Sequence, residues 1–191
     1  MIMDAAEKGV GIKDLYLHVF QRSQHEIGDL WQANKVSVAQ EHYCTAATQL
    51  IMSQLYPYLF STEKNGYSIV TTSVGGELHE LGVRMVADFF EIEGWDTYYL
   101  GANTPVESVI QTIEERRPHL LGISATLTRH VAGVREMIAE IKSTEIGKQV
   151  KILVGGHPFN ADPTLWKDVN ADGFGESADH AIAMAHELVL A

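Results

Sequence analysis

The sequence predicts two parts, an α/β domain with a parallel sheet of five strands and, before it, a small helical bundle. Apolar residues follow a helical period up to about residue 61, and short apolar runs alternate with helical stretches from residue 66 onward. A polar, turn-rich segment, STEKNG, lies between the two patterns. We therefore expect a helical domain over residues 1–61 and an α/β domain over residues 66–191.

The helical half is expected to contain a pair of antiparallel helices. Apolar residues recur at helical spacing from Leu15 to Trp31. A second helix is expected to begin at Ser37, because Gln40 follows three residues later in the pattern of a capping box. Only the short segment 33–35 separates the two stretches, so we expect the helices to pack against each other.

The second half alternates expected strands with expected helices. The strands are 67–72, 97–100, 120–124, 151–154 and a short one within 172–175. The helices are 81–93, 105–116, 131–142 and 178–190. Short strand–helix units of this kind imply a parallel sheet that is covered by helices on both faces.

Composition narrows the classes of protein that the chain can represent. No apolar run of about 18 residues is present, so a transmembrane helix is not expected. The first residues lack the features of a signal peptide and Cys44 is the single cysteine, which together predict a cytoplasmic protein. The net charge of −11 opposes binding to nucleic-acid phosphates. No P-loop, catalytic Ser-His-Asp series or paired-cysteine zinc pattern occurs. The leading hypothesis given below is a module that is not an enzyme.

The stretch GELHELG, residues 76–82, follows the first expected strand. A histidine at this place can project its imidazole over the carboxyl edge of the sheet, where open α/β sheets bind ligands. Glu77 can hold the second ring nitrogen of His79 and fix its tautomer, as metal-bound histidines usually require. Gly82 would let a bulky ligand approach the backbone closely.

Small and hydroxyl-bearing residues occur at the ends of the later strands. They are Ser124, Thr126 and Thr128 after the third strand, Gly155 and Gly156 after the fourth, and Gly173 and Gly175 around the fifth. Each group alone has an ordinary interpretation as turn chemistry. Together they are expected to line the same edge of the sheet as His79.

The spacing of these motifs resembles the cobalamin-binding domain of methionine synthase, corrinoid methyltransferase proteins and cobalamin-dependent mutases. That family combines D-x-H-x-x-G with S-x-L and then G-G at spacings close to those found here. In this sequence 41 residues separate Gly82 from Ser124, and 28 separate Thr126 from Gly155. Two positions depart from the family pattern, since Glu77 replaces aspartate and Thr126 replaces leucine.

The resemblance implies a Rossmann-like (flavodoxin-like) fold that binds cobalamin with its own base displaced. His79 would be the lower ligand of cobalt, Glu77 its hydrogen-bond partner, and the serine and glycine motifs would line a slot for the nucleotide tail. The implied cofactor-binding residues of this half are Glu77, Leu78, His79, Gly82, Ser124, Thr126, Thr128, Gly155, Gly156, Gly173 and Gly175, with His79 alone on the metal.

The helical half carries a second pattern, W-x9-E-H, formed by Trp31, Glu41 and His42. It resembles the cap signature of CarH/LitR-type adenosylcobalamin photoreceptors, in which these residues cover the upper corrin face and the adenosyl group. In the best-known photoreceptors a histidine after the tryptophan ligates cobalt in the light state. Here that position is Gln32, which leaves water or a histidine such as His42 as the upper ligand.

Two functions follow as hypotheses. The cap residues favour a light-sensing or regulatory module that holds adenosylcobalamin, changes conformation or assembly on photolysis, and acts as a homo-oligomer or through a fused or partner output domain. The alternative is a corrinoid protein that carries a methyl group between methyltransferases, with methylcobalamin as one form of the cofactor. A mutase subunit would need a partner to supply a substrate barrel. For His130 and His157 a cofactor contact and a surface-loop role are equally open.

Overall fold

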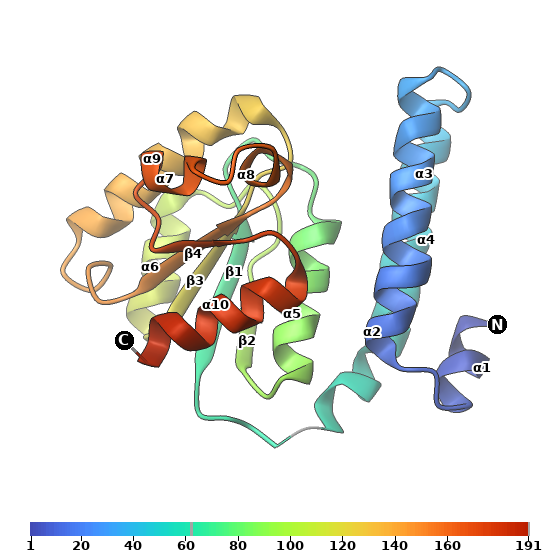
Figure 1. Cartoon of the computed structure of the whole chain (residues 1–191), viewed down its shortest axis with the longest axis horizontal. Helices are drawn as coiled ribbons and strands as arrows, with labels where there is room; N and C mark the ends of the chain where they lie inside the picture. Colours follow the sequence, from blue (N-terminus) through green and yellow to red (C-terminus); the bar gives the residue numbers. More distant parts are fainter. Residues whose placement is uncertain (62, 191) are drawn as a thin grey trace. The chain divides into compact units, whose positions relative to one another are not determined.

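The computed structural model describes residues 1–61 and 63–190, and it separates into two compact units, Met1–Ser61 and Thr62–Ala191 (Figure 1). The first unit is helical, and the second contains the sheet. In the part of the chain that the structure describes, no helix combines the length and the apolar character needed to cross a membrane.

The helical unit is built from two long helical stretches joined by a tight turn. Its elements are α1 (Ile2–Glu7), α2 (Ile12–Leu15), the π-helical segment η1 (Tyr16–Phe20), α3 (Gln21–Gln32), α4 (Val38–Leu55) and the 3-10 segment η2 (Tyr56–Ser61). α2, η1 and α3 follow one another without a break. The sequence analysis did not anticipate α1 or the π-helical segment.

Polar side chains fix the start of α4 and its alignment with α3. The Ser37 hydroxyl accepts a hydrogen bond from the Gln40 backbone N–H at 3.3 Å, and the Gln40 side chain accepts one from the Ser37 N–H at 2.9 Å. This confirms the predicted capping box. Gln24 of α3 donates to the Thr48 hydroxyl and accepts from the Thr45 hydroxyl, each at 2.9 Å. These bonds join the two helices as an antiparallel pair.

The second unit is a five-stranded parallel sheet in the order β2-β1-β3-β4-β5. Its strands are β1 (Ser68–Ser73), β2 (Asp96–Tyr99), β3 (Leu120–Ser124), β4 (Lys151–Gly155) and β5 (Gly173–Gly175). The helical elements are α5 (Leu81–Ile92), α6 (Val106–Arg116), η3 (Thr128–His130), α7 (Val131–Ser143), α8 (His157–Ala161), α9 (Leu165–Asp168) and α10 (Ala178–Leu190). The predicted Rossmann-like fold is confirmed, whereas the short α8 and α9 were not predicted.

Large aliphatic residues fill one face of the sheet. Val70, Leu121, Ile123, Ile152 and Val154 pack there with residues of α6, α7 and α8 in a single buried cluster. We call these five strand residues the aliphatic face. They alternate along each strand with residues that point to the other side, as a pleated strand requires.

The opposite face lies under α5 and α10 and is small and polar at its carboxyl end. Ser73, Ser124, Gly155 and Gly175 are neighbours across β1, β3, β4 and β5, and we call these four the small-residue row. A Cβ on Gly175 would come within 2.6 Å of the Ala181 Cβ in α10, so only glycine permits this approach of helix and strand. The two faces of one sheet are therefore built from different side chains.

Candidate functional site

The loop after β1 occupies the topological switch point of the sheet. The chain passes from β1 to β2 on one side and then returns to place β3 on the other side of β1. Open α/β sheets bind ligands in the crevice that such a reversal creates at the carboxyl ends of the strands. Glu77 and His79 lie in this loop, between β1 and the start of α5 at Leu81.

Two local features shape the loop. Gly76 adopts a φ of +81°, and the Glu77 N–H donates to the Val74 carbonyl at 3.0 Å, which closes a tight turn. Asn103, in the loop after β2, accepts from the Gly76 N–H at 2.7 Å, and its own N–H donates to the Glu77 carbonyl at 3.1 Å. Asn103 therefore fastens the β1 loop to the neighbouring loop.

Glu77 is fully buried and each of its carboxylate oxygens accepts several hydrogen bonds. Oε1 accepts from the His79 backbone N–H at 3.1 Å and lies 2.5 Å from His79 Nδ1. Oε2 accepts from the Thr126 N–H at 2.8 Å and the Leu127 N–H at 3.3 Å, and it lies 2.8 Å from His130 Nδ1. One carboxylate thus joins the β1 loop to the β3–α7 loop.

These contacts determine the charge of Glu77. Burial by itself would raise the pKa of the carboxyl group, because it disfavours the charged form. The hydrogen bonds from His130, from His79 and from the Thr126 backbone outweigh that effect and lower the pKa from 4.5 to about 2. Glu77 is therefore a carboxylate at neutral pH.

An ionised Glu77 fixes the tautomer of His79. Since a carboxylate only accepts hydrogen bonds, the Nδ1 atom of His79 must carry the proton that it shares with Oε1. The lone pair of the neutral ring then lies on Nε2, and the side chain is 55% exposed at the carboxyl edge of the sheet. This is the arrangement of a metal-binding imidazole that is held by a carboxylate.

The side chains at this edge offer a metal ion one protein ligand, the Nε2 atom of His79. Among the described residues no group of three or more His, Cys, Asp or Glu side chains is arranged to enclose a metal ion. A corrin ring supplies its own equatorial nitrogen atoms, so a single imidazole below the ring is all that it requires. The small-residue row lies at the same edge of the sheet and offers little more than backbone and hydroxyl groups to a ligand.

The contacts of four predicted site residues show what each residue does within the fold itself. Thr126 contributes its backbone N–H to Glu77. Gly156 has a φ of +106° and a Cβ there would lie 2.1 Å from the Ala125 carbonyl oxygen, so the fold alone requires glycine. Gly82, in the first turn of α5, has open space where a Cβ would stand. The Leu78 side chain is 74% exposed between two site residues.

The remaining predicted residues of this unit take up edge positions. Thr128 begins η3 and is exposed, and Gly173 opens β5. A Cβ on Gly173 would meet the Met184 side chain of α10 at 3.3 Å. Both residues lie on segments that end at the carboxyl edge or lead to it.

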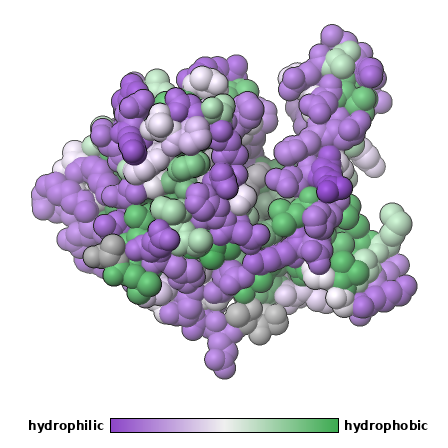
Figure 2. All heavy atoms as spheres, viewed as in Figure 1, coloured by the Kyte–Doolittle hydropathy of each residue, from purple (hydrophilic) through white to green (hydrophobic). Residues whose placement is uncertain are grey.

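The three predicted residues of the helical unit lie on its paired helices. Trp31 is in the last turn of α3 and is 44% exposed. Glu41 lies in the first turn of α4, where its Oε1 accepts from the Thr45 hydroxyl at 3.0 Å and its Oε2 lies 3.6 Å from His42 Nε2. Other large apolar side chains of these helices are also exposed, among them Val38, Tyr43 and Leu50. Figure 2 shows hydrophobic groups, in green, among hydrophilic ones, in purple, on the face of the molecule in view.

Sequence reasoning missed two residues of the site. His130 was left between a cofactor contact and a surface loop, but its side chain is only 12% exposed and binds the buried Glu77. Asn103 was not considered. Its position in the loop after the second strand, at the same edge as the histidine motif, was the signal that could have found it.

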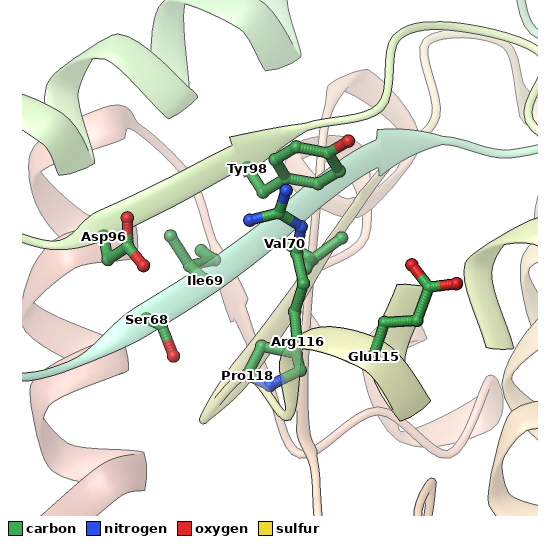
Figure 3. Close-up of a pocket in the computed structure, with 8 residues that line it drawn as sticks. All are labelled: Ser68, Ile69, Val70, Asp96, Tyr98, Glu115, Arg116 and Pro118. Carbon is green, nitrogen blue, oxygen red and sulfur yellow. The ribbon is translucent and has the colours of Figure 1, made fainter. Parts of the chain in front are cut away.

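A hollow of about 390 Å³ lies at the opposite edge of the sheet (Figure 3). It begins at the first residues of β1 and β2, Ser68 and Asp96, and the Arg116 guanidinium lies 3.4 Å from the centre of the Tyr98 ring beside it. None of the residues predicted for the site lines it. The site described above is therefore separate from this hollow.

Comparison with known proteins identifies the family. The B12-binding domain model matches residues 67–183, and a second B12-binding domain model matches residues 1–56. The chain belongs to the B12-binding family. The predicted cofactor, cobalamin, and the predicted helical domain ahead of a cobalamin-binding domain are thereby confirmed.

Similar proteins from Methanosarcina are corrinoid proteins. Dimethylamine corrinoid protein 2 of Methanosarcina mazei is 31% identical over 147 residues, which is 76% of this chain but 66%, just under two thirds, of that protein. The trimethylamine corrinoid protein of Methanosarcina barkeri is 24% identical and the match covers 94% of this chain and 83% of that protein. The monomethylamine corrinoid protein of Methanosarcina barkeri superposes with a TM-score of 0.84 at 23% identity, covering 97% of this chain and 88% of that one.

These comparisons correct part of the sequence analysis. The relatives are named as corrinoid proteins and not as photoreceptors, sensors or enzymes. The resemblance to CarH/LitR-type photoreceptors rested on Trp31, Glu41 and His42, three residues in the helical unit. A short pattern on two helices is weaker evidence than a similarity that extends over most of the chain. That similarity is to corrinoid proteins and not to photoreceptors.

Proposed function

We propose that this chain is a corrinoid protein that carries a methyl group between partner methyltransferases. The observation that carries the proposal is the pair Glu77 and His79, in which a buried carboxylate holds Nδ1 and leaves the Nε2 lone pair at the carboxyl edge of the sheet. Similarity to methylamine corrinoid proteins supports the same function. Cobalamin, when bound, supplies a cobalt centre that accepts a methyl group and releases it.

The residues of the chain would hold the cofactor and set its lower face. His79 would approach cobalt from below through Nε2, and Glu77 would keep the ring in its orientation. The small-residue row, with Gly156 and Gly173 beside it, would leave room for the nucleotide tail. Leu78 and Gly82 would meet the corrin, and Thr126 and Thr128 would lie along the tail. These roles follow from the positions of the residues at one edge of the sheet.

The helical unit would contribute contacts of a different kind. A methyl carrier must give two enzymes access to the upper face of the corrin, so its cap residues have to contact the cofactor without sealing it. Trp31, Glu41 and His42 are proposed cofactor contacts on this ground, with no light-dependent role. Gln32 is not required as a ligand in this role.

A titration by visible spectroscopy tests the proposal. The chain should bind hydroxocobalamin and methylcobalamin with the cofactor base displaced and an imidazole in its place, and His79→Ala should lose that spectrum. After chemical reduction, the loaded chain should take up a methyl group from methyl iodide and return it to a thiol. Failure to bind either form, or an unchanged spectrum in His79→Ala, would refute the proposal.

The same titration separates methyl carriage from light sensing. Adenosylcobalamin is compared with methylcobalamin, in the dark and after green light, while the assembly state is followed by light scattering. Selective tight binding of the adenosyl form, with a change of assembly on illumination, would support the sensor instead. Equal or tighter binding of methylcobalamin without a change of assembly supports the carrier.

A further inference from the structure

We propose that His130 is a positioning residue that limits how strongly His79 donates to cobalt, by sharing the Glu77 carboxylate with it. The inference rests on the proposed function, because it concerns the same lower ligand. The geometry behind it is a single buried carboxylate with one imidazole on each oxygen, His79 on Oε1 and His130 on Oε2.

Each contact of His130 points to a donor role. Its Nδ1 lies 2.8 Å from Glu77 Oε2, and its Nε2 accepts from the Arg129 Nε–H at 3.3 Å. Since Nε2 is an acceptor, the proton of the neutral ring lies on Nδ1 and is donated to the carboxylate. The side chain is almost buried at the N-terminal end of α7, so the donor is fixed in place by the packing of that helix.

Removal of the His130 donor would leave Glu77 in place. More of the negative charge of its carboxylate would then be available to the bond with His79. The Thr126 and Leu127 backbone N–H groups would still hold Oε2, and the His79 N–H would still hold Oε1. Hydrogen bonds that share one acceptor group compete for its charge, and bonds in a chain polarise one another. With His130 absent, the carboxylate would bind the His79 Nδ1–H more strongly and make Nε2 a stronger donor.

This effect matters for a carrier because its lower ligand has to be released. His79 Nε2 would have to leave cobalt when the bound cofactor is reduced to the +1 state and to bind it again after oxidation. A lower ligand that donates too strongly would disfavour the +1 state in which the cofactor accepts a methyl group. His130 would thus keep the His79 bond weak enough to be broken and formed again in each cycle.

The experiment measures the midpoint potential of the cobalt(II)/cobalt(I) couple of bound cobalamin by spectroelectrochemistry. His130→Phe removes the donor and keeps the volume of the ring, and His130→Asn keeps an N–H donor near the position of Nδ1. His119→Phe is the matched control, since His119 accepts from the Ser68 N–H at the far edge of the sheet. Thermal unfolding of each variant establishes that it is folded.

We expect His130→Phe to strengthen lower ligation by up to about tenfold, since His130 acts on His79 only through Glu77, whereas replacement of a group bound directly to a metal ligand changes affinity by about 10–100-fold. A tenfold change corresponds to a shift of about 59 mV in a one-electron couple, here to more negative potential. His130→Asn and His119→Phe should keep the wild-type potential. In a Glu77→Gln background the carboxylate charge is gone, so His130→Phe should have little further effect.

The outcomes separate this inference from the proposed function. An unchanged potential in His130→Phe, or a shift to more positive potential, would overturn the role of His130 even if His79 ligates cobalt. An equal shift in His130→Asn would also overturn it, because the donor would then be irrelevant. If wild type and His79→Ala have the same cobalt(II) spectrum, the proposed lower ligation itself is wrong.

Discussion

The two faces of the sheet show how one set of strands can serve stability and ligand binding separately. On the aliphatic face, Val70, Ile123 and Val154 are almost inaccessible and belong to one continuous core with α6 and α7. On the other face, the strands end in the small-residue row, and Glu77 and His79 follow directly after β1. The carboxyl edge therefore has small side chains where a cofactor tail would enter, while the opposite face supplies the core.

The largest effect is expected from a substitution on the aliphatic face, which should lower stability without lowering cobalamin affinity. Ile123→Ala should lower the free energy of unfolding by about 2–5 kcal/mol, because it removes buried methyl groups and leaves a cavity in the aliphatic core. Urea denaturation measures this loss. The cobalamin affinity of the protein that remains folded should stay at the wild-type value, and a matching loss of affinity would show that the faces are not independent.

Glu77 predicts a pH dependence at the ligand-binding edge. The pKa of this carboxyl group is lower in the folded chain, at about 2, than its ordinary value of 4.5. The stabilisation is therefore fully present above pH 4.5 and is lost as the pH falls towards 2. With allowance for screening by solvent near the loop, the loss is on the order of 2 kcal/mol.

The measurement is denaturation of the wild type and Glu77→Gln in parallel, without cofactor, at pH values from 6 down to about 2. The difference in unfolding free energy between the two proteins should shrink as the pH falls below 4.5, the ordinary pKa of this group. A difference that stays constant over this range would show that the folded chain does not hold Glu77 as a carboxylate.

Ser124 and Ile123 offer a sharper comparison, since these neighbours in β3 point to opposite faces. Ser124→Val should weaken cobalamin binding at least about tenfold, which is about 1.4 kcal/mol, because the added methyl group fills the proposed slot. Its unfolding free energy should change by less than about 1 kcal/mol. Ile123→Val should cost about 0.5–1.5 kcal/mol of stability and leave the affinity unchanged. Equal affinities in a visible titration would remove Ser124 from the slot.

The smallest effect concerns two adjacent threonines of β1. The buried Thr71 hydroxyl has no hydrogen-bond partner among the described residues, whereas the Thr72 hydroxyl donates to the Gly101 carbonyl at 3.2 Å. Thr71→Val should therefore be neutral or raise stability by up to about 1 kcal/mol, and Thr72→Val should lower it by about 1 kcal/mol. Thermal unfolding of both variants tests the contrast, and a marked loss in Thr71→Val would reveal an unrecognised partner for that hydroxyl.

The sequence was sufficient to predict the fold and the position of His79 at the carboxyl edge of the sheet, because both depend on local pattern. Alternating strands and helices predicted the sheet. The spacing from Gly82 to Ser124 and from Thr126 to Gly155 carried the resemblance to cobalamin-binding domains, and the family match confirms cobalamin as the cofactor. The capping box at Ser37 was readable for the same reason, since its two partners are three residues apart.

The rest depended on contacts between distant segments. His130 reaches Glu77 across 53 positions of the chain, and Asn103 reaches Gly76 across 27. No local pattern distinguishes His130 from an ordinary loop residue, and the one signal for Asn103 was its place after the second strand, at the same edge as the histidine motif. The structural requirement for glycine at position 156 was also hidden in the sequence, because the Ala125 carbonyl that excludes a Cβ there belongs to another loop. The W-x9-E-H pattern shows the opposite error, in which a short local match received more weight than it could bear.

The central claim is that His79 Nε2 is the lower ligand of bound cobalamin, and electron paramagnetic resonance of the cobalt(II) form tests it most directly. Protein labelled with ¹⁵N-histidine should show the splitting of a single ¹⁵N nucleus in place of the ¹⁴N pattern, because one imidazole of the protein is bound to cobalt. His79→Ala should lose that splitting, while His119→Ala should retain it. A ¹⁴N pattern that survives the labelling would mean that the cofactor keeps its own base, and the account of this site would be wrong.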